Sequence, residues 1–430
     1  MDTVSLSRRD FLRTSTVVGG GVLSGGLGIA RSAHAAGSDQ IKIALVGCGG
    51  RGRGAAANCL DVKDNIKLIA VADAFEDAAR QGAVGLKQQY GAKVDLPPER
   101  IFWGFDAYQK ALQAGPDLVL LVTPPGFRPL HYRAVVEAGK HVFMEKPCCV
   151  DAPGFRSLQE TNKLAEEKGL KVAVGLNMRH APGFHETIKR IHEGTVGAIS
   201  FMRCYGNNSG VWVRPRRSGQ TEMEYQIRNW YYFTWLSGDL IVEQTVHEID
   251  MANWAQCSHP VEANGMGGRQ VRTGKDHGQI FDHHFIEYTY ADGVKLFCQA
   301  RHIGGCFNSG AVAVHGSLGL ADCEGRIAGE HPWRYAGPQS SGHAQEHVDL
   351  IAAIRNGEKY HEGWYGATSS MTAVLGRMAT YSGQVVRWDD AVAKGTSEMP
   401  KRYAFDAEPP VRPDAQGNYP VPVPGVYRAY

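Results

Sequence analysis

The stretch IKIALVGCGGRGRG, residues 41–54, decides how the first half of this chain folds. Four apolar residues at 43–46 are followed at once by glycines, and the next segment, AAANCL, favours a helix. This pattern predicts a buried β-strand that turns sharply into the N-terminus of a helix. Gly47, Gly49 and Gly52 have the spacing G-x-G-x-x-G, which allows a tight turn, the approach of a pyrophosphate to the backbone and close packing of the helix on the strand.

A dinucleotide site at this turn would place the phosphates on unpaired N–H groups at the positive end of the helix dipole. The next apolar strand ends in Asp73, 26 residues after Gly47. A carboxylate there accepts hydrogen bonds from ribose hydroxyls and repels a 2′-phosphate, so the sequence favours NAD over NADP. The alternative is a glycine turn that serves packing alone. The residues that we expect to bind the cofactor are Gly47, Gly49, Gly50, Arg51, Gly52, Asp73, Thr123, Pro124, Glu145 and Lys146.

Strand-like and helix-like segments alternate from Ile41 to about Gly175, which predicts a doubly wound parallel sheet with helices on both faces. The expected strands are 41–46, 68–72, 118–122, 141–144 and 171–174, and the expected helices include 75–90, 107–114 and 129–138. In such a sheet a ligand binds beyond the carboxyl ends of the strands. We therefore assign residues 38–176 to a Rossmann domain, with its site where these strands end.

The pattern changes after Val174. Residues 198–206, 261–273, 280–290 and 294–303 alternate or are rich in β-branched and aromatic residues, which predicts a large, mostly antiparallel open sheet. Segments 346–356 and 368–381 again favour helices. We expect an α+β substrate and oligomerisation domain at 177–385, whose late helices pack back on the Rossmann domain. An extended, proline-rich tail is expected at 386–430.

Residues 1–36 have the features of a twin-arginine signal peptide. Ser7-Arg8-Arg9-Asp10-Phe11-Leu12 precedes an apolar region at 17–29 and an A-x-A cleavage site at 33–35. The alternative is a tail that contains two arginines by chance. We expect a periplasmic protein that is exported already folded, without a stable membrane anchor.

The charges exclude two classes of partner. The formal net charge is +2 for the whole chain and 0 without residues 1–35. This balance gives no electrostatic reason to expect binding to nucleic acid or to an anionic membrane.

The nine cysteines are odd in number and include no C-x-x-C pair, so we expect mainly buried thiols, with the adjacent Cys148 and Cys149 as the pair to examine.

Two segments carry acid–base groups. Lys146 directly follows a predicted strand, where its ammonium could stabilise a substrate oxygen during hydride loss. The alternative is a surface lysine paired with Glu145. Further along, Glu243 and His247 are four residues apart in a helical pattern, and Asp250 follows one turn later. An imidazole oriented by a carboxylate is a proton acceptor near neutral pH, although an ordinary ion pair on a helix surface has the same spacing.

Together these motifs resemble the glucose-fructose oxidoreductase, inositol dehydrogenase and rhizopine catabolism (Gfo/Idh/MocA) family. The resemblance rests on GCGGRG at 47–52, Asp73, Thr123-Pro124, EKP at 145–147 and the acid-x-x-x-His pattern at 243–247. It implies that Lys146 and His247 are the catalytic pair, with Glu243 where the family usually has Asp. It also implies a Rossmann domain plus an open-sheet domain that often forms homodimers or homotetramers.

A polyhydroxylated ring suits aromatic faces that are combined with Arg, Asn and His donors. We expect Arg179, Arg228, Asn229, Trp230, His247 and His284 to contact substrate. The same residues could instead belong to a core or an interface. Asp282-His283-His284 could suggest a metal, but neighbours in a strand face opposite sides, so we expect no metal and one histidine that reaches the substrate.

The function that these residues favour is an NAD-dependent oxidoreductase acting on a secondary hydroxyl of a sugar, glycoside or cyclitol, with a tightly held cofactor. Export supports tight retention, because the periplasm has no dependable pool of NAD. Two alternatives are a redox-neutral glycosidase or epimerase that acts through a keto-sugar, and a non-catalytic protein that binds sugar or nucleotide.

Overall fold

The strand before the glycine turn lies in the middle of a parallel sheet. In the computed structural model, which describes residues 39–430, β1 (Ile41–Val46) pairs with β2 (Ile66–Asp73) on one side and with β4 (Leu118–Leu121) on the other. The six strands follow the order β3-β2-β1-β4-β5-β6, with β3 at Ile101–Trp103, β5 at His141–Met144 and β6 at Val172–Val174. This is the doubly wound order of a Rossmann domain. The sequence predicts all of these strands except β3, whose three residues are too short a pattern.

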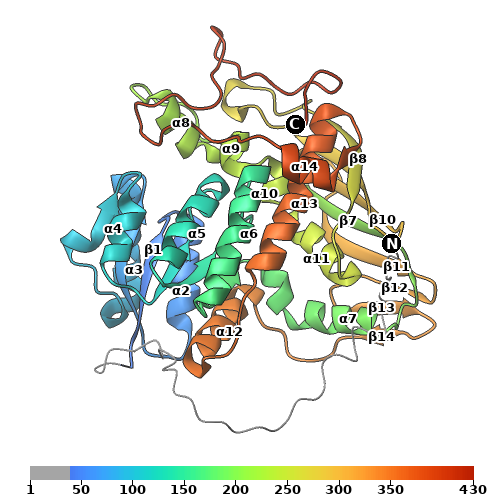
Figure 1. The fold of residues 1–430 in the computed structure, drawn as a ribbon, viewed down its shortest axis with the longest axis horizontal. Helices are drawn as coiled ribbons and strands as arrows, with labels where there is room; N and C mark the ends of the chain where they lie inside the picture. The colour runs from blue at the N-terminus through green and yellow to red at the C-terminus, as the bar shows by residue number, and fades with distance from the viewer. Residues whose placement is uncertain (1–38) are drawn as a thin grey trace, which may run out of the picture. The chain divides into compact units, whose positions relative to one another are not determined.

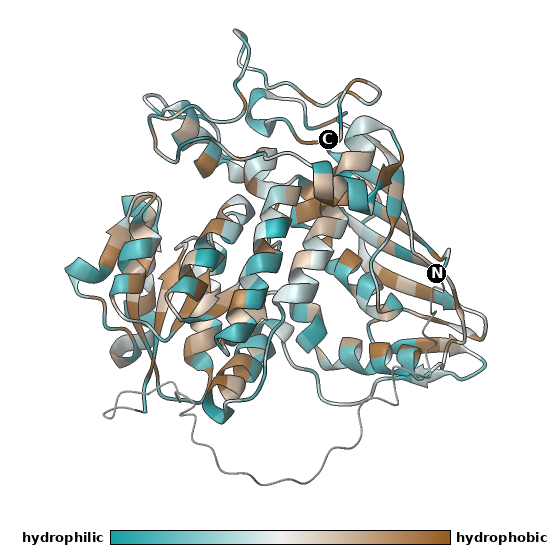
Figure 2. Ribbon diagram, viewed as in Figure 1, coloured by the Kyte–Doolittle hydropathy of each residue, from teal (hydrophilic) through white to brown (hydrophobic). Residues whose placement is uncertain are grey.

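Helices flank this sheet (Figure 1): α2 (Gly50–Asp61), α3 (Glu76–Tyr90), α4 (Ala107–Gln113), α5 (Arg128–Glu137) and α6 (Ala152–Glu167). The strands between them are almost wholly buried and apolar, as the brown interior of Figure 2 shows. Burial on both faces explains why these strands read as continuous apolar runs.

A second sheet has nine strands in the order β14-β13-β12-β11-β7-β10-β9-β8-β15. Its longer members are β7 (Ile199–Asn208), β8 (Glu262–Gly268), β9 (His283–Thr289), β10 (Lys295–His302) and β11 (Ser309–Gly316). All pairs are antiparallel except β7 with β10. The sheet ends in the short strands β12 (Gly319–Ala321), β13 (Arg326–Gly329) and β14 (Trp333–Arg334), which the sequence does not predict.

The helices of the second half pack on this sheet and on the Rossmann domain. They are α7 (Pro182–His192), α8 (Glu222–Arg228), α9 (Thr234–Ser237), α10 (Leu240–Glu243), α11 (Val246–Gln256), α12 (Gly342–Asn356) and α13 (Gly363–Ser382). Helices α11 and α13 contact the nine-stranded sheet, and α13 also contacts α6. Helix α12 buries Leu350, Ile351 and Ile354 in the Rossmann core. Residues 40–430 consequently form one compact unit.

The C-terminal segment differs in part from the expected extended chain. Residues 386–394 form β15 (Val386–Arg387), which pairs with β8, and α14 (Trp388–Lys394). The remaining residues, 395–430, form no helix or strand and pack along their own chain. The ring of Tyr419 lies 4.9 Å from that of Phe233, and the ring of Tyr427 lies 5.4 Å from that of Tyr381. Within residues 39–430, no helix is long and apolar enough to cross a membrane.

Arg128 joins the carboxyl ends of two neighbouring strands. Its fully buried guanidinium donates to the carbonyl oxygens of Leu121 (2.7 Å) and Thr123 (2.6 Å) after β4, and to that of Glu145 (3.0 Å) after β5. Burial lowers the pKa of Arg128 to about 10, so the side chain remains charged at neutral pH. The planar fork with five donors suits this arrangement, which a lysine could not reproduce.

We expect Arg128→Met to lower the free energy of unfolding by about 3 kcal/mol or more, because three buried carbonyl groups lose a charged donor. Arg133→Met is the matched control, since Arg133 lies on the same helix in an exposed ion pair with Glu137. Urea unfolding of both variants measures the difference. Equal stability of the two variants would contradict the bridging role.

Candidate functional site

The glycine turn has the geometry of a phosphate cradle. Gly47 has φ +101°, and a Cβ there would lie 2.5 Å from the backbone carbon of Val122. A Cβ at Gly52 would lie 1.8 Å from the oxygen of Gly47. By contrast, a Cβ at Gly49 or Gly50 would meet nothing within 4 Å. The first and third glycines of the motif are thus required for packing, while the backbone between them is open at the N-terminus of α2, where a pyrophosphate binds.

Asp73 lies at the end of β2, beside this turn. Its carboxylate accepts hydrogen bonds from the backbone N–H groups of Cys48 (2.7 Å) and Phe75 (3.0 Å). Burial raises the pKa of Asp73, although these two donors act in the opposite direction. Each carboxylate oxygen keeps a further lone pair, so Asp73 can still accept ribose hydroxyls. The turn and Asp73 together fit a dinucleotide.

Lys146 pairs with Glu243 across the carboxyl edge of the Rossmann sheet. Its Nζ lies 3.1 Å from Glu243 Oε1 and 2.7 Å from the backbone oxygen of the same residue. Both side chains are 13% exposed. The alternative pairing of Lys146 with Glu145 is not the one observed, because Glu145 binds Arg51 instead.

His247 lies on a separate helix from Glu243. Glu243 is the last residue of α10, and His247 is the second residue of α11, so the predicted single helix is broken at 244–245. The Nδ1 atom of His247 is buried and has no hydrogen-bond partner. Burial, with the nearby charges of Lys146, His343 and Arg51, lowers the pKa of His247 well below its ordinary value. The imidazole is therefore neutral at neutral pH and can accept a proton.

Arg51 connects the glycine turn to both halves of the chain. Its guanidinium pairs with Glu145, next to Lys146, and with Glu346 of α12 at 3.2 Å. Burial raises the pKa of Glu346 to about 7.

Thr123 and Pro124 follow β4 at the same edge. The Thr123 hydroxyl lies 3.1 Å from His131 Nδ1 and 3.4 Å from the guanidinium of Arg128. The predicted cofactor residues thus converge, and the sequence did not indicate Arg128 or Glu346.

The residues predicted to bind substrate separate into different places. Arg179 forms a two-point ion pair with Asp250 (2.7 and 2.9 Å), one turn after His247, and its guanidinium lies 3.8 Å from the ring centre of Tyr365. It therefore lies near α11, the helix that carries His247. Arg228 instead contacts Asp77 and Phe75 of the β2–α3 segment, which places it beside Asp73.

Asn229 and His284 differ from the expectation of substrate contact. Asn229 is fully buried, and its amide bonds the N–H of Arg214, the oxygen of Asp276 and the hydroxyl of Tyr225. His284 is buried between β9 and α13, with Nδ1 2.9 Å from Thr380 Oγ1 and Nε2 3.3 Å from Asp239. Both side chains are occupied inside the second domain. The sequence correctly placed Asn229 in a loop and His284 in a strand, but it did not indicate that both side chains are buried.

Trp230 packs in an aromatic cluster, with its ring 5.7 Å from Trp212 and 5.6 Å from Tyr231. Cys148 and Cys149 are buried. In the part of the chain that the structure describes, no group of three His, Cys, Asp or Glu side chains is arranged to hold a metal ion.

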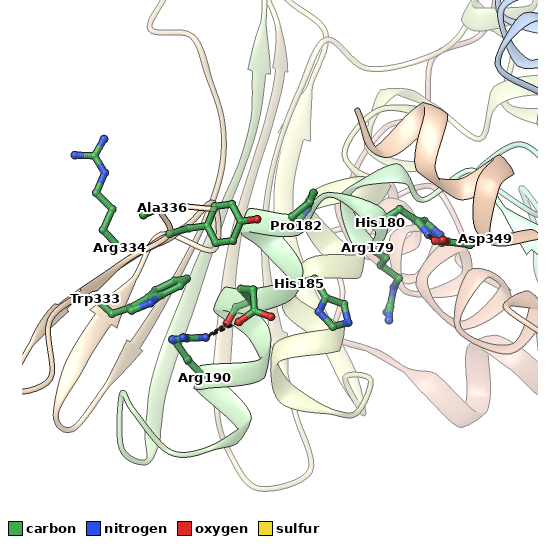
Figure 3. Close-up of a pocket in the computed structure, with 11 residues that line it drawn as sticks. Arg179, His180, Pro182, His185, Arg190, Trp333, Arg334, Ala336 and Asp349 are labelled. Carbon is green, nitrogen blue, oxygen red and sulfur yellow. Dashed lines mark hydrogen bonds and ion pairs between the residues drawn. The ribbon is translucent and has the colours of Figure 1, made fainter. Parts of the chain in front are cut away.

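A cavity of about 680 Å³ lies next to Arg179 (Figure 3), between α7, β14 and the start of α12. On one side Arg190 lies over the ring of Trp333, at 4.0 Å from its centre, and Arg334 points away from the cavity. On the other side His180 lies 2.7 Å from Asp349. Lys146, Glu243 and His247 do not line this cavity, so it is separate from the acid–base centre.

His180 holds Arg179 in place. It lies between two carboxylates, Asp349 on α12 at 2.7 Å and Glu362 at 3.0 Å. Burial alone would lower the pKa of His180, but the two carboxylates raise it to about 10. The charged imidazole therefore connects the 3₁₀ helix Asn177–His180, which carries Arg179, to α12.

Comparison with known proteins agrees with an NAD-binding Rossmann fold. Residues 41–176 match the profile described as an oxidoreductase family with an NAD-binding Rossmann fold. Over these residues, the chain matches the Gfo/Idh/MocA oxidoreductase family. Its curated relatives include inositol 2-dehydrogenase of Rhizobium meliloti (strain 1021), 24% identical over 284 residues, or 66% of this chain and 76% of that protein. A scyllo-inositol 2-dehydrogenase (NAD(+)) of Bacillus subtilis (strain 168) is 24% identical over 58% of this chain and 60% of its own length.

The fold of residues 40–430 is also similar to that of solved sugar and inositol oxidoreductases. Aldose-aldose oxidoreductase from Caulobacter crescentus, complexed with glycerol, superposes with a TM-score of 0.64 at 16% identity, covering 81% of this chain and 99% of that chain. At this identity the likeness shows the fold alone. The Rossmann domain with a mostly antiparallel nine-stranded sheet is therefore the architecture that the resemblance implies.

The pairing of His180 predicts a pH dependence of stability. Because the pKa of His180 is about 10 in the folded chain and about 6.5 in an unfolded one, its stabilisation is fully present below pH 6.5 and is lost as the pH rises towards 10. We expect His180→Gln to remove on the order of 3 kcal/mol at pH 6 and much less at pH 10. Chemical unfolding at both pH values measures this, with the exposed His331→Gln as control. A His180→Gln effect that is the same at both pH values would contradict it.

Proposed function

We propose that this protein is an NAD-dependent dehydrogenase that oxidises a secondary hydroxyl of a sugar, glycoside or cyclitol. The observation that carries the proposal is the convergence of Lys146, Glu243 and a neutral His247 at the carboxyl edge of a Rossmann sheet. The dehydrogenase names of the relatives support it. Neither a redox-neutral glycosidase or epimerase nor a non-catalytic binding protein has support among those relatives.

The side chains have complementary roles in this proposal. Bound NAD supplies the hydride acceptor. His247 takes the hydroxyl proton at its buried, unpartnered imidazole. Lys146 donates a hydrogen bond to the same oxygen and stabilises its developing negative charge, while Glu243 holds the ammonium in position. Arg179, which pairs with Asp250 on the helix that carries His247, is the substrate contact that we propose among those predicted from sequence.

The acid at the end of β2 supports NAD as the cofactor rather than NADP, because Asp73 repels a 2′-phosphate.

A homo-oligomer is part of the proposal. The face of the nine-stranded sheet away from α11 and α13 carries aromatic side chains with exposed surface, including Phe285 at 38%. The rings of Phe201 and Phe285 lie 6.1 and 6.5 Å from that of Phe297. Such a face suits a second copy of the chain.

The test is reduction of NAD by the purified protein with myo-inositol, scyllo-inositol and a panel of aldoses and methyl glycosides, followed by absorbance at 340 nm in single and multiple turnover. We expect Lys146→Met to lower the rate of hydride transfer by about 100-fold or more, because the oxygen loses its charged donor. Lys163→Met, an exposed lysine on α6, is the matched control. A wild-type protein that reduces no NAD with any polyol, or a Lys146→Met variant as fast as wild type, would refute the proposal.

Export to the periplasm by the twin-arginine route is a further part of the proposal, supported by the motif at 7–12 and the A-x-A site at 33–35. These residues lie outside the described part of the chain. We expect replacement of Arg8 and Arg9 by lysine to keep the full-length protein in the cytoplasm. Cell fractionation and intact mass measure this, with Arg13→Lys as control. Unchanged export of the double variant would exclude this route.

A further inference from the structure

The adenosine half of the dinucleotide site is covered by two segments that are distant in sequence. In the strand order of this sheet, Asp73 marks where the adenosine ribose binds. Phe75 donates its N–H to Asp73, so the Phe75 ring belongs to the rim of the same position. What contacts Phe75 therefore lies at the adenosine end of the site.

The first covering segment is the end of α8. The guanidinium of Arg228 lies 3.8 Å from the ring centre of Phe75 and pairs with Asp77 at 3.1 and 3.2 Å. Arg214 lies beside it, with its guanidinium 3.1 Å from the backbone oxygen of Arg228. Its charge also interacts with that of Asp73.

The second covering segment is the C-terminal tail. Phe405 stacks on Phe75, with ring centres 5.2 Å apart and an angle of 29° between the rings, and lies 4.9 Å from Phe105, which follows β3. Tyr403 lies 5.7 Å from Phe127, which follows β4. The tail thus crosses the carboxyl ends of β2, β3 and β4.

The two segments are joined to each other. Gln226 of α8 donates to the oxygen of Val411 in the tail at 2.7 Å. The hydroxyl of Tyr419 bonds Glu222 of α8 and accepts from Arg216 at 3.0 Å. Figure 1 shows the tail running beside α8. Since they hold each other, α8 and the tail act as a single cover.

The contacts that hold this cover to the Rossmann domain are weak enough to break and re-form. The Asp77 side chain is 52% exposed, so its ion pair with Arg228 is screened by water. The other contacts of the clasp region are ring contacts, each worth about 0.5–1.5 kcal/mol, and among these rings only Phe127 is buried. Nearer to α14, the tail is held to the Rossmann domain by the N–H of Glu398, which donates to Asp151 at 2.8 Å. Contacts of this strength can break to let a nucleotide enter, and while they are formed they slow its escape.

We propose that Arg228 and Phe405 form a clasp, closed on Phe75, that limits the rate at which NAD leaves the adenosine end of the site. The inference rests on the proposed binding of NAD and adds to it the residues that retain the cofactor. Nicotinamide chemistry at Lys146 is not part of the clasp, because the clasp residues lie on the side of β2 and β3 and Lys146 follows β5. Retention can therefore change without a change in hydride transfer.

The test measures release of NADH from the loaded full-length protein. Protein saturated with NADH is mixed with a large excess of NAD, and the loss of bound-NADH fluorescence gives the dissociation rate. We expect Arg228→Gln and Phe405→Ala each to raise this rate about tenfold or more, since they remove the contacts that must break on opening. Arg412→Gln and Tyr430→Ala, two exposed positions of the same tail, are the controls and leave the rate unchanged.

A third variant keeps the test independent of folding defects. Asp77→Asn removes the ion-pair partner of Arg228 on the Rossmann domain and leaves its pair with Glu224 within α8. It should raise the rate in wild type but not in Arg228→Gln. Dissociation rates of Arg228→Gln and Phe405→Ala equal to wild type would overturn the clasp. A protein that binds NADH with these rates but oxidises no polyol would refute the proposed function and leave the clasp standing, whereas a folded wild type without affinity for NADH would overturn both.

Discussion

The ion pair between Lys146 and Glu243 is the contact on which the arrangement of the site depends. An ammonium that is only 13% exposed is costly unless a carboxylate and further acceptors lie within reach. Glu243 supplies both its side chain and the carbonyl group that ends α10. Because the Lys146 ammonium takes that carbonyl, the chain turns at 244–245 and α11 starts afresh, with His247 in its first turn. The position of Lys146 is thus linked to that of His247.

Two arginines, Arg128 and Arg51, stabilise the carboxyl edge of the Rossmann sheet. Arg128 donates to carbonyl groups at the ends of β4 and β5, one of which, that of Leu121, also accepts from the N–H of Glu145. Arg51 leaves the glycine turn to pair with Glu145 and with Glu346 of α12. Parallel strands end at one edge, so their last carbonyl groups gather there and attract cations. Burial, together with the charges of Lys146, His343 and Arg51, lowers the pKa of His247.

The resemblance and the local patterns were most accurate where backbone geometry dictates residue type. Gly47 and Gly52 are required by a positive φ or by a close approach, and Asp73 by its place at a strand end. Side chains whose role depends on what packs against them were predicted less well. Arg228 packs on Phe75 beside Asp73, and Asn229 and His284 are buried. A polar residue near an aromatic run has the same sequence pattern whether it faces a ligand or another side chain.

By itself, the sequence determined the parallel sheet and the position of the glycine turn, because the periodicity of buried strands and the spacing of glycines are local properties of the chain. Only the tertiary structure decided that Glu243 pairs with Lys146, that Arg128 ties two strand ends together, and that the proline-rich tail lies across β2, β3 and β4. These contacts join residues up to several hundred positions apart. Such partners are selected by packing and by the need to pair buried charge, and neither is written in the order of neighbouring residues.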